Sequence, residues 1–132
     1  MTLTTGLPVE RFLQTLEIVA REGKQLSYSW KNLFIQAMNV EWVERLEHNP
    51  GCAEQLEAFV SRFGRMQDTM AAKLFPRWLL ALAETPGSQI ETLNRAERLG
   101  VLTSTERWLE ARNLRNRLGL AKQSLPRIRA QI

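Results

Sequence analysis

The sequence predicts an all-α protein, an antiparallel bundle of four main helices followed by a short C-terminal helical tail. Apolar residues recur at steps of three and four along almost every segment, which is the spacing of one helix face, and no segment keeps the alternation of a strand. Helix-starting patterns occur at Ser88 and Thr103, and Gly100 stands where a glycine commonly ends a helix. The connections between these segments are short, as in helical bundles.

Length and composition indicate one domain that spans residues 1–132. A chain of this size buries about two thirds of its unfolded surface, which is enough for a hydrophobic core. Cys52 is the only cysteine and His48 the only histidine. An intramolecular disulfide is therefore excluded, and a zinc site, which uses about four nitrogen or sulfur ligands, is not expected. We expect neither a metal nor a cofactor.

The chain has no recognisable export or membrane signal. Its first residues lack a basic start followed by a long apolar segment. The longest apolar run, from Trp78 to Ala83, is far shorter than the roughly 20 residues that a membrane span needs. We therefore expect a cytoplasmic protein that does not bind membranes.

The first helix is expected from Pro8 to about Asn39. Gly23 weakens its middle by about 1 kcal/mol relative to alanine and marks a point where the helix could break. A short helical segment is expected at 41–47, and a turn at 48–51, where proline and glycine favour a change of direction. The apolar face of the first helix contains Phe12, Leu13, Leu16, Val19, Ala20, Leu26, Trp30, Leu33, Phe34 and Ala37.

A long helix is predicted from about Ala53 to Glu84. Pro76 lies inside it and should kink it, because proline removes one backbone hydrogen bond. The apolar face of this helix contains Leu56, Phe59, Val60, Phe63, Met66, Met70, Leu74 and Trp78.

Two further helices are predicted from their capping patterns. The third begins at Ser88, where Glu91 completes a capping box, and it ends at Gly100. The fourth follows a second box of the same kind at 103–106. Pro126 prevents this helix from continuing into the C-terminal tail.

The fourth helix carries a basic edge. Residues 107–132 contain seven Lys or Arg and one Glu, a local charge of +6 in a chain of net charge +4. Arg112, Arg115, Asn116 and Gly119 lie three and four residues apart on this edge, and Arg117 adds a further charge. Such arginines could bind phosphate bidentately. The alternative is an exposed edge that pairs with acidic residues of the long helix.

Asp68 and Gln67 lie at the margin of the apolar face of the long helix. An unpaired buried carboxylate is costly, so we expect Asp68 to have a cationic partner, and an arginine of the fourth helix is the obvious candidate. In that case Asp68 and Gln67 organise a site and take no part in chemistry. The alternative is that Asp68 lies on the surface.

The chain resembles the HepT-like toxin proteins of the HEPN superfamily. The resemblance rests on GRMQDTMAAKLFPRWLLAL in the long helix, ETLNRAERLGVL in the third helix and WLEARNLRNRL in the fourth. The family motif is an arginine, four residues, a histidine, one residue and a tyrosine. Arg115, followed by Asn116, matches its start, whereas Leu120 and Lys122 replace the histidine and the tyrosine.

The resemblance implies a function as well as a fold. Active family members are metal-independent ribonucleases that act as homodimers, and a small nucleotidyltransferase neutralises them by adenylylating the motif tyrosine. Leu120 cannot transfer protons as histidine does, and Lys122 cannot accept AMP as tyrosine does. Arg115 and Asn116 are then the remnant of the catalytic motif.

We therefore expect a catalytically inactive HepT-like partner subunit of a toxin–antitoxin pair, forming a homodimer and binding a small nucleotidyltransferase. Two alternatives stay open. One is an active endoribonuclease toxin. The other is a helical RNA-binding module that uses Arg112, Arg115 and Arg117.

Overall fold

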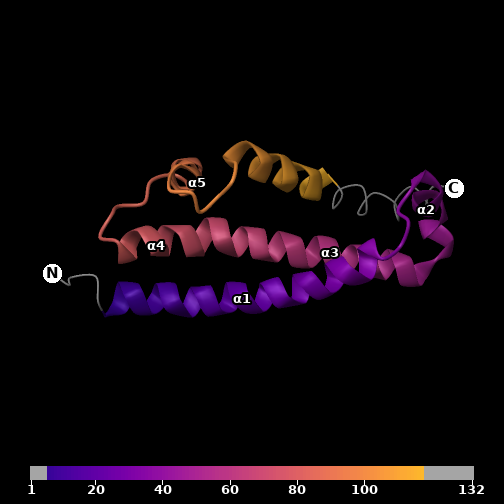
Figure 1. Ribbon diagram of the computed structural model, residues 1–132, viewed down its shortest axis with the longest axis horizontal. Coiled ribbons are helices and arrows are strands. Elements are labelled where there is room, and N and C mark those ends of the chain that lie inside the picture. Colours follow the sequence, from indigo (N-terminus) through magenta and orange to yellow (C-terminus); the bar gives the residue numbers. More distant parts are fainter. Residues whose placement is uncertain (1–5, 118–132) are drawn as a thin grey trace, which may run out of the picture.

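The computed structural model describes residues 6–117, which form helices and connecting turns without a strand (Figure 1). The all-α prediction is confirmed. The elements in chain order are α1 (Leu7–Phe34), α2 (Val40–Arg45), the 3₁₀ turn η1 (Leu46–His48), α3 (Pro50–Thr69), the π-helical segment η2 (Met70–Leu74), α4 (Phe75–Ala81) and α5 (Gln89–Arg98). A last helical segment covers residues 105–117. None of the described helices is both long enough and apolar enough to cross a membrane.

The helices form two regions that share one long helix. α3, η2 and α4 follow one another without interruption, and α1 lies antiparallel to them along their length; we call these four elements the hairpin (Figure 1). α5 and residues 105–117 lie on the other side of the long helix, and we call them the second layer (Figure 1). One apolar cluster joins the two regions, and it contains Val19, Ala71, Leu74, Phe75, Leu93 and Ala96.

α1 is one unbroken helix of 28 residues, in which Pro8 lies in the first turn. Gly23 does not interrupt it. The helix ends at Phe34 and not near the predicted Asn39. Asn39 instead caps α2, because its side chain accepts a hydrogen bond of 2.8 Å from the backbone N–H of Trp42.

α3 begins earlier than predicted, within the expected turn at 48–51. The side chain of Asn49 accepts a hydrogen bond of 3.2 Å from the backbone N–H of Cys52, and Pro50 occupies the first turn of the helix. Proline is favoured there because its missing N–H has no partner to lose. The Pro-Gly pair therefore starts a helix and does not form a separate turn.

The long helix passes through Pro76 because a π-helical segment lies directly before it. In this segment the backbone N–H of Phe75 donates to the carbonyl of Met70, five residues earlier. The wider turn holds one extra residue and accommodates the proline within a continuous helix. The helix ends at Ala81, three residues before the predicted Glu84.

Hydrogen bonds from side chains and backbone cap both ends of α5. Ser88 Oγ accepts from the backbone N–H of Glu91 at 3.3 Å, as predicted. α5 ends with Gly100 at φ 77, and the N–H of Val101 donates to the carbonyl of Ala96 at 2.9 Å.

The cap of the last helix differs from the predicted box at 103–106. Ser104 Oγ accepts from the backbone N–H of Arg107 at 3.2 Å, so the cap lies one residue later than predicted. The acidic partner comes from α5, where Glu97 Oε1 accepts from the backbone N–H of Thr105 at 2.8 Å. Glu97 of α5 thus takes the role that the capping box assigned to Glu106.

Candidate functional site

The candidate site lies where the last described helix meets α3, and Arg115 is its centre. Arg115 Nη1 donates to the backbone carbonyl of Gly64 at 2.9 Å and to Asp68 Oδ1 at 3.0 Å. Arg115 Nε and Nη2 donate to Oδ1 of Asn116 at 3.3 and 3.1 Å. All three guanidinium nitrogens therefore have partners within the described part of the chain.

Gly64 makes this arrangement possible. A Cβ atom at this position would lie 2.7 Å from Cδ of Arg115, closer than van der Waals contact allows. The missing side chain lets the arginine cross the surface of α3 and reach the backbone. Sequence analysis did not single out Gly64, although a glycine inside a strongly helical pattern often marks a close approach of this kind.

Asp68 pairs with Arg115, the kind of partner that we expected, but the two side chains differ in burial. The side chain of Arg115 is 15% exposed, whereas that of Asp68 is 67% exposed. We expected this pair because a buried Asp68 carboxylate would need a positively charged partner. In the structure the arginine is the sheltered member, and the carboxylate reaches it from the solvent side.

Gln67 is buried and connects the two helices by a different route. Its Nε2 donates to the backbone carbonyl of Trp108 at 2.9 Å. Three buried polar atoms of this contact region have no hydrogen-bond partner among the described residues: Gln67 Oε1, Trp108 Nε1 and Thr105 Oγ1. Buried polar atoms are normally satisfied by protein groups or ordered water, so these three atoms mark the polar part of the contact between the last helix and the long helix.

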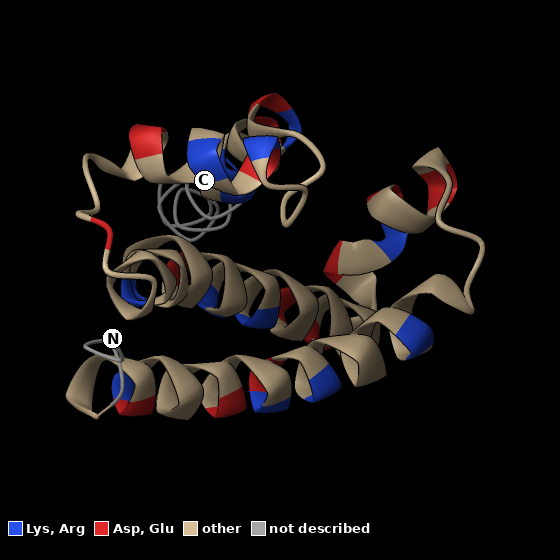
Figure 2. Cartoon of the chain, turned by 60° about the vertical axis from the view of Figure 1, so that its left-hand side comes forward, with Lys and Arg blue, Asp and Glu red and all other residues tan. Residues whose placement is uncertain are grey.

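The other two arginines of the predicted basic edge lie apart from this contact. Arg112 Nη1 donates to Gln89 Oε1 of α5 at 2.9 Å. Arg117 is exposed. In Figure 2 basic and acidic segments occur together in the second layer, so its described part is mixed in charge. Gly119, Leu120 and Lys122, which complete the motif region, lie outside the described residues.

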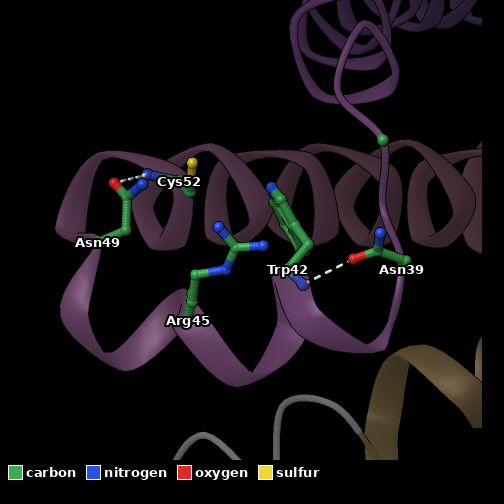
Figure 3. Close-up of a pocket in the computed structure, with 6 residues that line it drawn as sticks. Asn39, Trp42, Arg45, Asn49 and Cys52 are labelled. Atoms are coloured by element: carbon green, nitrogen blue, oxygen red, sulfur yellow. Dashed lines mark hydrogen bonds between the residues drawn. The ribbon is translucent and has the colours of Figure 1, made fainter.

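A hollow lies at the far end of the hairpin (Figure 3), lined by Ala37, Asn39, Trp42, Arg45, Asn49 and Cys52. Gln36 organises its wall. Gln36 Oε1 accepts from Trp42 Nε1 at 2.9 Å and from Cys52 Sγ at 3.2 Å, and Gln36 Nε2 donates to Gln55 Oε1 at 2.7 Å. These hydrogen bonds fix α2 against α3, and the thiol of Cys52 takes part in one of them.

Comparison of the chain with protein-family models, with curated proteins and with solved structures finds no match.

Proposed function

We propose that this chain is a catalytically inactive, HepT-like partner subunit that binds a small nucleotidyltransferase. The observation that carries the proposal is the state of Arg115. Its guanidinium is held by Gly64, Asp68 and Asn116, so the motif arginine acts as a clamp between two helices. An arginine that served a phosphate in a cleavage reaction would need donors free to reach the substrate.

The position of the only histidine supports the same conclusion. His48 ends the turn before α3, and Gly64, which Arg115 contacts, lies 14 residues into that helix. At 1.5 Å per residue the two positions are about 21 Å apart along the helix axis. General acid–base catalysis needs the group within about 3 Å of the proton that it moves, so His48 of the same chain cannot work together with Arg115.

The proposal is tested with purified chain and a fluorescein-labelled single-stranded RNA. We expect no cleavage above background, because a lost general acid or base costs about 10²- to 10⁴-fold in rate. A small nucleotidyltransferase from the same genome should form a stoichiometric complex with the chain, measured by light scattering. Cleavage by the unmodified chain that Arg115→Ala abolishes would instead support the endoribonuclease alternative.

A matched pair of variants sharpens this test. Leu120→His combined with Lys122→Tyr restores the family motif, and the same double variant with Arg115→Ala removes the arginine again. Cleavage by the first variant and none by the second would identify a decayed nuclease site. RNA binding without cleavage that weakens steeply with salt would favour the RNA-binding module.

We also propose that the chain forms a homodimer. Large apolar side chains are exposed along α1 and around the α1–α2 connection, among them Leu13, Trp30, Ile35, Val40 and Val43. Exposed apolar side chains in this number commonly mark a protein–protein contact. A dimer mass by light scattering at tens of micromolar is the expected result.

A further inference from the structure

The feature that carries a further inference is a second apolar stripe on α1. The inner face of this helix packs against the long helix through residues such as Val19 and Leu33, which are buried. A parallel set of positions lies beside it, again at alternating steps of three and four residues, which is the spacing of a coiled-coil seam. We call this set the outer stripe, and it consists of Leu13, Leu16, Ala20, Gly23, Ser27, Trp30 and Phe34.

The large side chains of the outer stripe are about half exposed in the single chain, and two of them, Trp30 and Phe34, also contact Phe59 of α3. The stripe's four large members, Leu13, Leu16, Trp30 and Phe34, are 52%, 44%, 53% and 46% exposed. Its three central members are small, so another helix could approach closely there. Trp30 and Phe34 stack on each other with ring centroids 4.2 Å apart, which gives the far end of the stripe a fixed shape.

A column of charges runs beside the outer stripe and indicates what covers it. Glu10, Glu17, Lys24 and Lys31 follow one another at steps of seven residues, so they lie on one line along α1. All four are exposed, and none has an ion-pair partner among the described residues. Figure 2 shows acidic segments in the N-terminal half of α1 and only basic segments toward its far end.

This order of charges is complementary to itself in the antiparallel direction. If a second α1 lies alongside in reverse, Glu10 and Glu17 meet the partner's Lys31 and the partner's Lys24. The same register places Ala20 against the partner's Gly23 and Leu13 against the partner's Trp30. A parallel alignment would give the charges no charged partner, because the other flank of the stripe consists of inner-face residues such as Val19 and Leu33, which are buried in the hairpin.

We propose that two copies of this chain pair through the outer stripes of their α1 helices in an antiparallel, two-fold arrangement. The inference rests on the proposed homodimer and specifies its surface. α1 and the second layer lie on opposite sides of the long helix (Figure 1), so the long helix of each copy separates its second layer, which carries Arg115, from the paired α1 helices. The two candidate sites then cannot form one shared cleft.

Charge reversal tests the pairing. One variant carries Glu10→Lys and Glu17→Lys, and a second carries Lys24→Glu and Lys31→Glu. Each variant alone should have a dimer dissociation constant raised at least about tenfold, because every pair becomes repulsive. An equimolar mixture should recover tight association, and so should a chain with all four reversals. The four positions are exposed, and circular dichroism confirms that each variant is folded.

Cysteine cross-linking locates the surface independently. In a Cys52→Ser background, chains with Leu16→Cys mixed with chains with Ser27→Cys should form a disulfide. Leu16→Cys mixed with Tyr28→Cys is the matched control and should not, because residue 28 points to another side of α1.

The outcomes separate this inference from the function proposed above. If both charge variants dimerise as tightly as the original chain, the dimer stands but the α1 surface is wrong. A monomer mass for the unmodified chain would overturn both the dimer and its surface. Neither result would affect the nucleotidyltransferase complex or the absence of RNA cleavage, which are measured separately.

Discussion

The hairpin and the second layer are held together in different ways. Apolar side chains along α1 and the long helix close the hairpin, and the rings of Trp30, Phe34, Phe59 and Phe63 extend this contact to its far end. The second layer has a smaller apolar contact and relies on Arg115 and Gln67 for its polar connections. Three buried polar atoms at this contact have no hydrogen-bond partner within residues 6–117. Because its apolar contacts repeat over a greater length, we expect the hairpin to be the more stable region.

Truncating one buried leucine in each region should show the difference in stability between the two regions most clearly. Leu33 lies in the hairpin and Leu93 in α5, and they are 1% and 0% exposed. Each change to alanine should lower the free energy of unfolding by about 2–5 kcal/mol. Leu93→Ala should speed amide hydrogen exchange in α5 and in residues 105–117 while α1 and α3 keep their protection, whereas Leu33→Ala should speed exchange in the hairpin. Equal acceleration of all helices by Leu93→Ala would show that the two regions unfold as one unit.

Gly64→Ala should have the next largest effect. The added methyl group would overlap Arg115, so we expect a loss of about 1–3 kcal/mol, mainly in the attachment of residues 105–117. The same change in an Arg115→Ala background removes the overlap. There the higher helix propensity of alanine should stabilise the chain by about 1 kcal/mol. Urea unfolding of the four chains gives this double-mutant cycle, and additive effects would show that Arg115 does not cross Gly64 in solution.

The smallest expected effects come from the helix ends of the two regions. The long helix is followed by Ala83 at φ 60, and α5 by Gly100 at φ 77. Ala83→Gly should stabilise by a few tenths to about 1 kcal/mol, because it relieves left-handed backbone strain. Gly100→Ala should destabilise by about 1 kcal/mol for the same reason. Thermal unfolding of both variants checks these signs, and two shifts in the same direction would rule out strain as the cause.

The fold could be predicted because periodicity and capping are local properties of the sequence. The main helices follow from them, as do Ser88 and Gly100 as ends of α5. The errors arise where one residue can serve two elements. Asn39 can extend α1 or cap α2, and its side-chain bond to Trp42 favours the cap, a choice that apolar spacing cannot reveal.

The pairing of Asp68 with an arginine of the last helix was predictable from the sequence, but Gly64 and the relative burial of the two side chains were not. The charges of Asp68 and Arg115 and their places on two helices suggest that they meet. Which of the two is sheltered depends on how residues 105–117 lie on α3, and that depends on the missing side chain of Gly64. Glu97, which caps another helix eight residues away in sequence, is equally invisible to a local pattern.

The length of α1 has a consequence for how the protein behaves in solution. Its 28 residues extend for about 42 Å at 1.5 Å per residue, whereas a sphere with the radius of gyration of about 14 Å that is typical of this chain length would be about 36 Å across. The described part of the chain is elongated along its long helices (Figure 1), so it should have greater friction than a sphere of equal mass. It should elute early from a sizing column, and antiparallel pairing would thicken the molecule more than lengthen it. Elution volume alone would therefore not distinguish an elongated monomer from a compact dimer, whereas light scattering measures the mass directly.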